Sequence, residues 1–177
     1  MKNQLYYLVT LAVLAISCAG NQEQTAAPEP PGIGYGVYAE GEQRSITSGN
    51  QENIAIWEAY IKAHNEGNLD AIGDLNAEGF KAFGPRGEVI DGNEAHMAFL
   101  TEWFAAANPK WKSNWFITNA INNDKGELTQ WVTSGHDITL TVDDQTINAV
   151  QIHDALIEEG RVKMFFVYER VKPAEDE

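Results

Sequence analysis

The stretch Ala149–Arg170, AVQIHDALIEEGRVKMFFVYER, decides the fold of this chain. Apolar and polar residues alternate on both sides of the EEG triplet, and such a triplet is typical of a tight turn. We therefore predict two antiparallel strands, Thr146–Ile157 and Arg161–Val171, joined as a hairpin. Both faces of the second strand carry large apolar residues, so that strand needs cover on both sides of the sheet.

The same stretch places His153 next to Asp154. Because successive side chains of a strand leave opposite faces, these two residues cannot form a hydrogen-bonded pair within a regular strand. His153 is expected to share a face with Gln151, and Asp154 to lie on the other face with Leu156. The pattern therefore excludes a His-Asp dyad and leaves His153 as a single candidate side chain.

Upstream of this hairpin, the period of the apolar residues changes once. Before Pro109 the apolar residues mostly recur every three or four positions, as in a helix, and after it they recur at every second position, as in a strand. We therefore predict three helices followed by a meander of strands. The predicted helices are Ile54–His64, Leu69–Leu75 and a third from Asp91 to Asn108, and the predicted strands are Phe80–Phe83, Trp111–Asn119 and Leu128–Val142. In the second of these strands, Trp111 and Trp115 are expected to share a face. The sequence thus predicts an α+β fold.

The N-terminus resembles a bacterial lipoprotein signal. Lys2 precedes the uncharged apolar run Leu5–Ile16, which ends in LAISC at Cys18. The run is too short to span a bilayer, which takes about 20 residues, but it suits the core of a signal peptide. The resemblance implies that residues 1–17 are removed and that Cys18 carries lipid. A plain secretory signal or an uncleaved anchor is the alternative.

Three further segments follow from composition. Residues 18–50 hold the cysteine and a stretch rich in Gly, Pro, Gln and Glu, which predicts a flexible tether. Residues 51–172 form the α+β domain, and residues 173–177 an acidic tail. The alternative for residues 32–44 is that Tyr35, Val37 and Tyr38 pack on the domain.

The charge and the missing motifs exclude several functions. The chain carries 12 basic and 26 acidic residues, and loss of Lys2 with the signal leaves 11 − 26 = −15. This charge disfavours nucleic acid as a partner. The chain has one cysteine, so no internal disulfide is possible. The four histidines follow no metal-binding spacing, and we find no phosphate loop or nucleophile elbow, so neither metal nor cofactor is predicted.

The order of elements carries a resemblance to a known superfamily. The W-x-x-Y-I pattern from Trp57, the EGNLDAI segment, the GPRG turn and the final HDALIEEGRVKMFFVYER are similar to the nuclear transport factor 2-like superfamily, and within it to SnoaL-like and ketosteroid isomerase-like domains. The resemblance spans about 120 residues by the order of its motifs. It implies three N-terminal helices packed on a strongly curved antiparallel sheet, making a cone-shaped fold with one deep pocket.

The resemblance also implies candidate site residues. Tyr60 matches a tyrosine that donates to the substrate oxygen in ketosteroid isomerases, and His153 falls at or beside the second donor. Gly84 stands where those enzymes have their proton-shuttling aspartate, so the isomerase activity is not expected to carry over. Candidate acid–base groups are Tyr60, His64 and His153. The predicted ligand-binding residues are Trp57, Tyr60, His64, Trp115, Gln151, His153 and Phe165.

Two functions remain open at this point. One is an envelope-anchored domain that binds a small, mostly apolar ligand in an aromatic pocket without catalysis. The other is a SnoaL-like isomerase or dehydratase-type enzyme that uses Tyr60, His64 and His153. In either case the protein is expected to sit in the bacterial cell envelope with its lipid in a membrane, on the periplasmic side or at the cell surface. A homodimer through the outer face of the sheet is the expected assembly.

Overall fold

The computed structural model describes residues 31–172 of the 177-residue chain. Three α-helices and eight strands make up this part, together with a short 3-10 helix at Ala39–Gly41. The helices are α1 Glu52–Glu66, α2 Leu69–Leu75 and α3 Asn93–Ala107. The strands are β1 Gly32–Val37, β2 Gln43–Ser48, β3 Asn76–Phe83, β4 Val89–Asp91, β5 Lys110–Asn122, β6 Leu128–Val142, β7 Gln145–Glu158 and β8 Arg161–Val171.

Helix α1 forms because apolar residues recur along one of its faces. Trp57, Tyr60, Ile61 and His64 are all buried on that face. Gly67 follows the helix at φ +66°, a left-handed conformation that glycine adopts without strain, and its N–H bonds the carbonyls of the last turn. The helix therefore ends where the sequence analysis expected, and its buried side chains point at the sheet.

The sheet is mixed rather than wholly antiparallel. Its strand order is β1-β2-β5-β6-β7-β8-β3-β4. The predicted meander β5 to β8 is present with antiparallel pairing throughout. However, β3 pairs with β8 in parallel, which the prediction of an antiparallel sheet did not include. Strands β3 and β8 are separated in the chain by β4, α3 and β5 to β7, and two parallel strands need a long connection of this kind.

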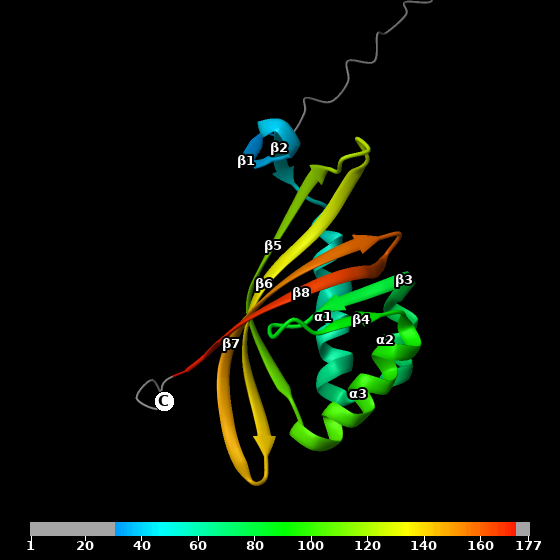
Figure 1. The fold of residues 1–177 in the computed structure, drawn as a ribbon, viewed down its shortest axis with the longest axis vertical. Coiled ribbons are helices and arrows are strands. Elements are labelled where there is room, and N and C mark those ends of the chain that lie inside the picture. The colour runs from blue at the N-terminus through cyan, green and yellow to red at the C-terminus, as the bar shows by residue number, and fades with distance from the viewer. Residues whose placement is uncertain (1–30, 173–177) are drawn as a thin grey trace, which may run out of the picture.

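All three helices lie on one side of the sheet, and the strands twist strongly as they cross in front of them (Figure 1). The core fills the space between the two layers. Its fully buried members include Trp57, Ile72, Phe80, Leu100 and Val132, each at most 2 % exposed. The α+β prediction of three helices on a curved sheet is therefore confirmed.

The prediction of a flexible tether is wrong for residues 32–48. Strands β1 and β2 form a hairpin there, and β2 extends the sheet by pairing Thr47 with Ala120 and Ser48 with Asn119 of β5. The hairpin lies at the end of the molecule far from α3 (Figure 1). Of the three side chains expected to hold it, Tyr35 and Val37 are exposed, whereas Tyr38 is half-buried and lines a hollow with residues of β5 to β8. Backbone pairing at the edge of β5 attaches this segment, together with Arg44, which donates to the carbonyls of Asn122 and Asn123.

Several predictions fall outside residues 31–172. The signal segment 1–17, the lipid site Cys18 and the acidic tail 173–177 all lie there, so they stay predictions. Within the described part, no helix is long and apolar enough to cross a membrane.

Candidate functional site

The inner faces of the two central strands carry polar side chains. Ser134 and His136 come from β6, and Gln151 and His153 from β7, and all four are buried. The register pairs Ser134 with His153 and His136 with Gln151. Because residues two apart on a strand share a face, the four side chains form one patch that faces the helices.

A cavity of about 150 Å³ lies against this patch. Side chains from α1, α3, β5, β7 and β8 line it, together with the turn between β3 and β4. Four of its walls are aromatic rings: Trp57, Trp103, Trp111 and Phe165. An apolar cavity of about 150 Å³ is large enough for a benzene molecule. The space therefore suits a molecule built on a single ring or of similar bulk.

The end of the cavity nearest α2 is held by a hydrogen-bonded cluster around Tyr60. The Tyr60 hydroxyl donates to Oδ1 of Asn76 over 2.7 Å, and Nδ2 of Asn76 lies 3.1 Å from Nδ1 of His96. Nδ1 of His64 donates to the Tyr60 carbonyl over 2.8 Å. The proton of Tyr60 and the Nδ1 proton of His64 are thus already used within the chain.

A second cluster joins α1 to the strands. Nε1 of Trp57 donates to Oγ of Ser134 over 2.8 Å, and that oxygen lies 2.7 Å from Nε2 of His136. Nδ1 of His136 lies 3.1 Å from Oγ of Ser113. The indole N–H can only donate, so the Ser134 oxygen accepts from Trp57. Every polar atom in this chain of bonds has a partner.

A third cluster runs from the mouth of the cavity inward. Nε2 of Gln151 donates to Oε2 of Glu169 over 2.8 Å. Oε1 of Gln151 accepts from Nε1 of Trp111 over 2.8 Å and lies 2.9 Å from Nε2 of His153. Within residues 31–172, Nδ1 of His153 is the single buried side-chain nitrogen or oxygen without a hydrogen-bond partner.

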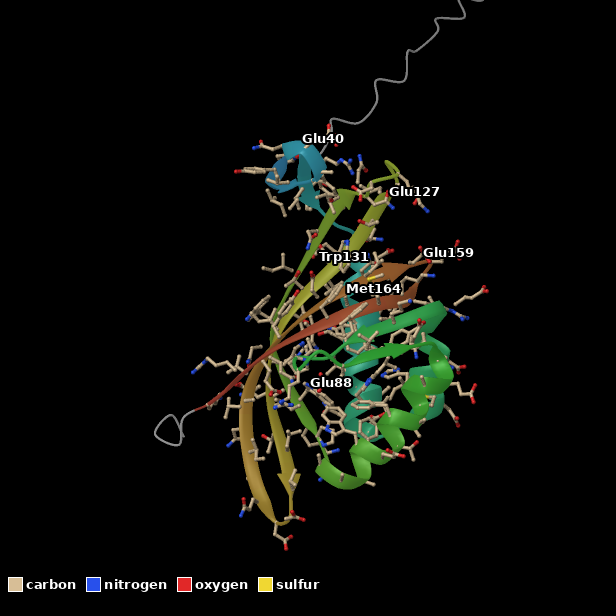
Figure 2. The ribbon with its side chains drawn as sticks, in the orientation of Figure 1. Glu40, Glu88, Glu127, Trp131, Glu159 and Met164 are labelled. Carbon is tan, nitrogen blue, oxygen red and sulfur yellow. The ribbon has the colours of Figure 1, made fainter. Side chains whose placement is uncertain are left out.

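Charged residues stand at the mouth. A guanidinium nitrogen of Arg86, in the turn between β3 and β4, lies 3.1 Å from Oε1 of Glu169. Oε2 of Glu88 accepts from the Arg86 backbone N–H over 2.9 Å and so holds the turn; Figure 2 labels Glu88 beside that turn. The Arg86 side chain is 71 % exposed and that of Glu169 only 11 %, so the carboxylate belongs to the cavity and the arginine to its rim.

Burial keeps all four histidines of the site uncharged near neutral pH. Desolvation lowers the pKa of His64 and of His136 to about 4. Desolvation, with the nearby His64, lowers the pKa of His96 to about 3, and desolvation with two neighbouring histidines lowers the pKa of His153 further below its usual value. Burial also raises the pKa of Tyr60 well above its usual range. The cavity is therefore an uncharged environment with charges only at its mouth.

Most of the residues predicted to bind ligand do line the cavity. They are Trp57, Tyr60, His64, Gln151, His153 and Phe165.

Trp115 does not line the cavity, and its prediction is wrong. The pairing of β5 with β6 shifts between Ser113 and Trp115, which marks a β-bulge at Asn114. Beyond the bulge every side chain changes face, because the side-chain period of a strand is two. Trp115 therefore lies on the outer face, 42 % exposed, against Gly135, where an added Cβ would come within 2.3 Å of the indole nitrogen.

The lining residues that were missed include the polar and aromatic side chains of Arg86, His96, Trp103, Trp111 and Glu169. Two of them had a signal in the sequence. Glu169 continues the inward alternation of Phe165 and Val167, and His96 lies four residues before the buried Leu100 of α3. Arg86 comes into place only when the β3–β4 turn meets β8, a contact that no local pattern reports.

The cavity does not offer a metal site of the usual kind. Among the described residues, no group of three or more His, Cys, Asp or Glu side chains could hold a metal ion. The histidine rings are close, with centroids 4.5 Å apart for His136 and His153, but three of their four nitrogens are bonded to other side chains.

No protein-family model matches the chain, and no curated protein sequence is similar to it. Solved structures do resemble it. One is an LEH-like epoxide hydrolase of M. tuberculosis, with a TM-score of 0.56 and 14 % identity over 67 % of this chain and 83 % of that one. Another is Bal32a from a soil-derived mobile gene cassette, with a TM-score of 0.55 and 16 % identity over 67 % and 89 % of the two chains.

A third is a ketosteroid isomerase-like protein of Erwinia carotovora atroseptica, with a TM-score of 0.53 and 13 % identity over 68 % of this chain and 94 % of that one. At these identities the likeness concerns the fold. The chain therefore has the fold that these three structures share.

Proposed function

We propose that this protein binds one small, uncharged and mostly apolar molecule in the interior cavity. The observation that carries the proposal is the character of the space: an aromatic cavity of about 150 Å³ whose histidines are all held neutral. A charged ligand would lose its hydration among these rings, and Arg86 and Glu169 at the mouth already pair with each other. An apolar one would exchange water for ring contacts.

The test is native mass spectrometry of the purified chain, compared with two tryptophan variants of adjacent residues. Val167→Trp adds bulk on the cavity side of β8, whereas Tyr168→Trp adds bulk on the exposed outer side. We expect a retained molecule in the wild type and in Tyr168→Trp, and its loss in Val167→Trp. Retention by all three proteins would contradict binding in the cavity.

We also propose that the protein is anchored in the bacterial cell envelope through lipid on Cys18, as the resemblance of residues 1–18 to a lipoprotein signal supports. Strand β1 begins at Gly32, so a connecting segment separates the proposed lipid from the sheet. In a bacterial host the wild type is expected in the membrane fraction and Cys18→Ser in the soluble fraction. The intact mass of the wild type should include the acyl chains.

A second candidate is an acid–base enzyme, either of the isomerase or dehydratase type or hydrolytic like the structural neighbour from M. tuberculosis. One observation favours it: the Glu169 carboxylate and the bare Nδ1 of His153 are both proton acceptors at the cavity. Against it, burial makes the imidazoles weak bases, and the proton of Tyr60 goes to Asn76. Turnover of a bound molecule that Glu169→Gln abolishes would favour this candidate over binding alone.

A further inference from the structure

We propose that the molecule in the cavity presents a hydroxyl group that donates a hydrogen bond to Nδ1 of His153, and that Gln151 and Glu169 are the positioning residues that keep Nδ1 free to accept it. This inference rests on the proposed binding function and names the chemistry of its ligand.

The first step concerns the orientation of the Gln151 amide. Its two ends meet groups that can act in one direction only. The ionised carboxylate of Glu169 accepts, so the atom 2.8 Å from its Oε2 must be the amide nitrogen. The indole nitrogen of Trp111 donates, so the atom 2.8 Å from it must be the amide oxygen. Both contacts lock the amide in the same orientation.

The second step carries this orientation to His153. Nε2 of His153 lies 2.9 Å from Oε1 of Gln151, which accepts, so Nε2 carries the ring proton. A neutral imidazole has one N–H, and its other nitrogen is an acceptor. Nδ1 of His153 is therefore a bare lone pair on a side chain that is 3 % exposed and lines the cavity.

The third step asks whether the chain can supply a donor to Nδ1. The neighbouring rings are Trp57, with centroids 5.8 Å apart in an edge-on arrangement, and His136, at 4.5 Å. The indole proton of Trp57 goes to Ser134, and both ring nitrogens of His136 meet serine hydroxyls, so its ring proton goes to Ser113 or Ser134 in either tautomer. Both adjacent donors are thus used elsewhere.

A buried acceptor left in this condition has lost the hydrogen bond that water gave it, and native structures rarely leave such groups unexplained. A donor from a molecule in the cavity restores the bond. The smallest neutral group that both brings a donor and keeps the rest of the molecule apolar is a hydroxyl, as in an alcohol or a phenol. The ring-sized space makes phenol a suitable probe.

The experiment compares phenol with toluene, which has nearly the same shape and no donor, by calorimetric titration of the purified chain. We expect phenol to bind about 3- to 10-fold more tightly than toluene, the range that one net hydrogen bond gives. In His153→Phe this preference should disappear while toluene still binds. Gln151→Met removes the acceptor that keeps the ring proton on Nε2 of His153. It should therefore reduce the preference for phenol, and it serves as the test if His153→Phe does not fold.

The positioning role is read separately from the nitrogen-15 spectrum of the histidine rings. In the wild type we expect a protonated Nε2 and a bare Nδ1 for His153, with Nδ1 shifted by phenol but not by toluene. Glu169→Met removes one of the two contacts that fix the Gln151 amide, so it should raise the share of the other His153 tautomer and reduce the preference for phenol. Glu88→Met is the matched control, because Glu88 also lines the mouth but bonds Arg86 rather than Gln151.

The outcomes separate the two proposals. Equal binding of phenol and toluene by the wild type, unchanged in His153→Phe, would overturn the hydroxyl inference and leave the proposed binding function standing. Failure of both probes to bind would count against the binding function itself. A His153 ring with its proton on Nδ1 in the wild type would overturn the roles of Gln151 and Glu169.

Discussion

The inner and outer faces of the central sheet differ in which side chains lack a partner. On the inner face, polar side chains such as Ser134 and Gln151 are buried, and nearly all their hydrogen bonds are made within the chain. On the outer face, large apolar side chains remain open to solvent: Trp115, Ile117, Ile152 and Tyr168 are 41 to 58 % exposed. This reverses the simple expectation of apolar side chains inside and polar ones outside.

The outer face also has a hollow. Trp131 and Met164, labelled in Figure 2, lie in it on β6 and β8, and Tyr38 of the N-terminal hairpin lines its far side. Several large exposed apolar side chains on one face mark a contact site more often than single exposed residues do. The contrast teaches that the inner face lacks one small donor, whereas the outer face lacks a whole partner surface.

The largest expected effect is a loss of stability in acid, and it comes from the buried histidines on the inner side of the sheet. The unfolded histidines titrate near pH 6.5, while in the folded chain their pKa values are lowered to about 4 for His64 and His136 and about 3 for His96. Between these values the unfolded state binds more protons, so the free energy of unfolding falls as the pH falls. Each histidine contributes up to about 1.4 kcal/mol per pH unit, which makes roughly 4 kcal/mol per unit near pH 5 for these three. The lowered pKa of His153 acts in the same direction.

Urea denaturation at pH 7, 6 and 5 measures this slope. Carboxylates change little in charge over most of that range, so histidines dominate it. A slope below about 1 kcal/mol per pH unit would mean that the histidines are not held neutral, and the stated contrast between the faces would lose its electrostatic basis.

The next effect compares adjacent residues on opposite faces of β6. Ser134→Ala leaves the buried N–H of Trp57 and Nε2 of His136 without their partner, so we expect a loss of about 2 to 3 kcal/mol in the free energy of unfolding. Thr133→Ala removes a bond to the half-buried Asp154 on the outer face and should cost no more than about 1 kcal/mol. Equal losses in urea denaturation would remove the distinction.

A substitution on the outer face should change the oligomeric state of the protein rather than the stability of its fold. We predict a homodimer through this face, and Ile117→Glu places a charge in its apolar centre. The variant should sediment with the mass of a monomer and keep its fold, because Ile117 is 54 % exposed in the single chain. Leu128→Glu is the control and should leave the mass unchanged, because Leu128 is exposed at the start of β6 but shares the inner side of that strand with the buried Val132. Sedimentation of the wild type with the mass of a monomer would contradict the prediction.

The smallest effect is expected at the rim of the cavity. Arg86→Gln removes an ion pair whose arginine is 71 % exposed, and such pairs contribute about 0.5 kcal/mol or less to folding. A thermal unfolding curve close to that of the wild type is therefore expected. A loss comparable to that of Ser134→Ala would show that the rim is part of the inner network rather than an edge open to water.

Much of the architecture could be predicted because its signals are local. The strands β6, β7 and β8 alternate over many residues and are separated by clear turns, and α1 has its buried stripe and terminal glycine. Gln151 and His153 followed directly from that alternation. Their assignment to the inner face needed no knowledge of other parts of the chain.

The errors arose where distant segments meet. The hairpin of β1 and β2 is held by backbone pairing with β5, and residue types do not report such pairing. The parallel contact of β3 with β8 and the Arg86–Glu169 pair depend on the same long-range closure. Trp115 was misplaced for a different reason, since a bulge at Asn114 leaves no mark in the polarity pattern.

That bulge has a consequence for how the chain can change over time. The loss of one codon at Asn114 would remove the extra residue and make Ser113 and Trp115 neighbours in a regular strand. Ser113 would still pair with His136 and Trp115 with Gly135, so Trp115 would stay on the outer face and Phe116 on the inner face. The extra residue is therefore one that evolution could delete without exchanging the inner and outer side chains of the strand.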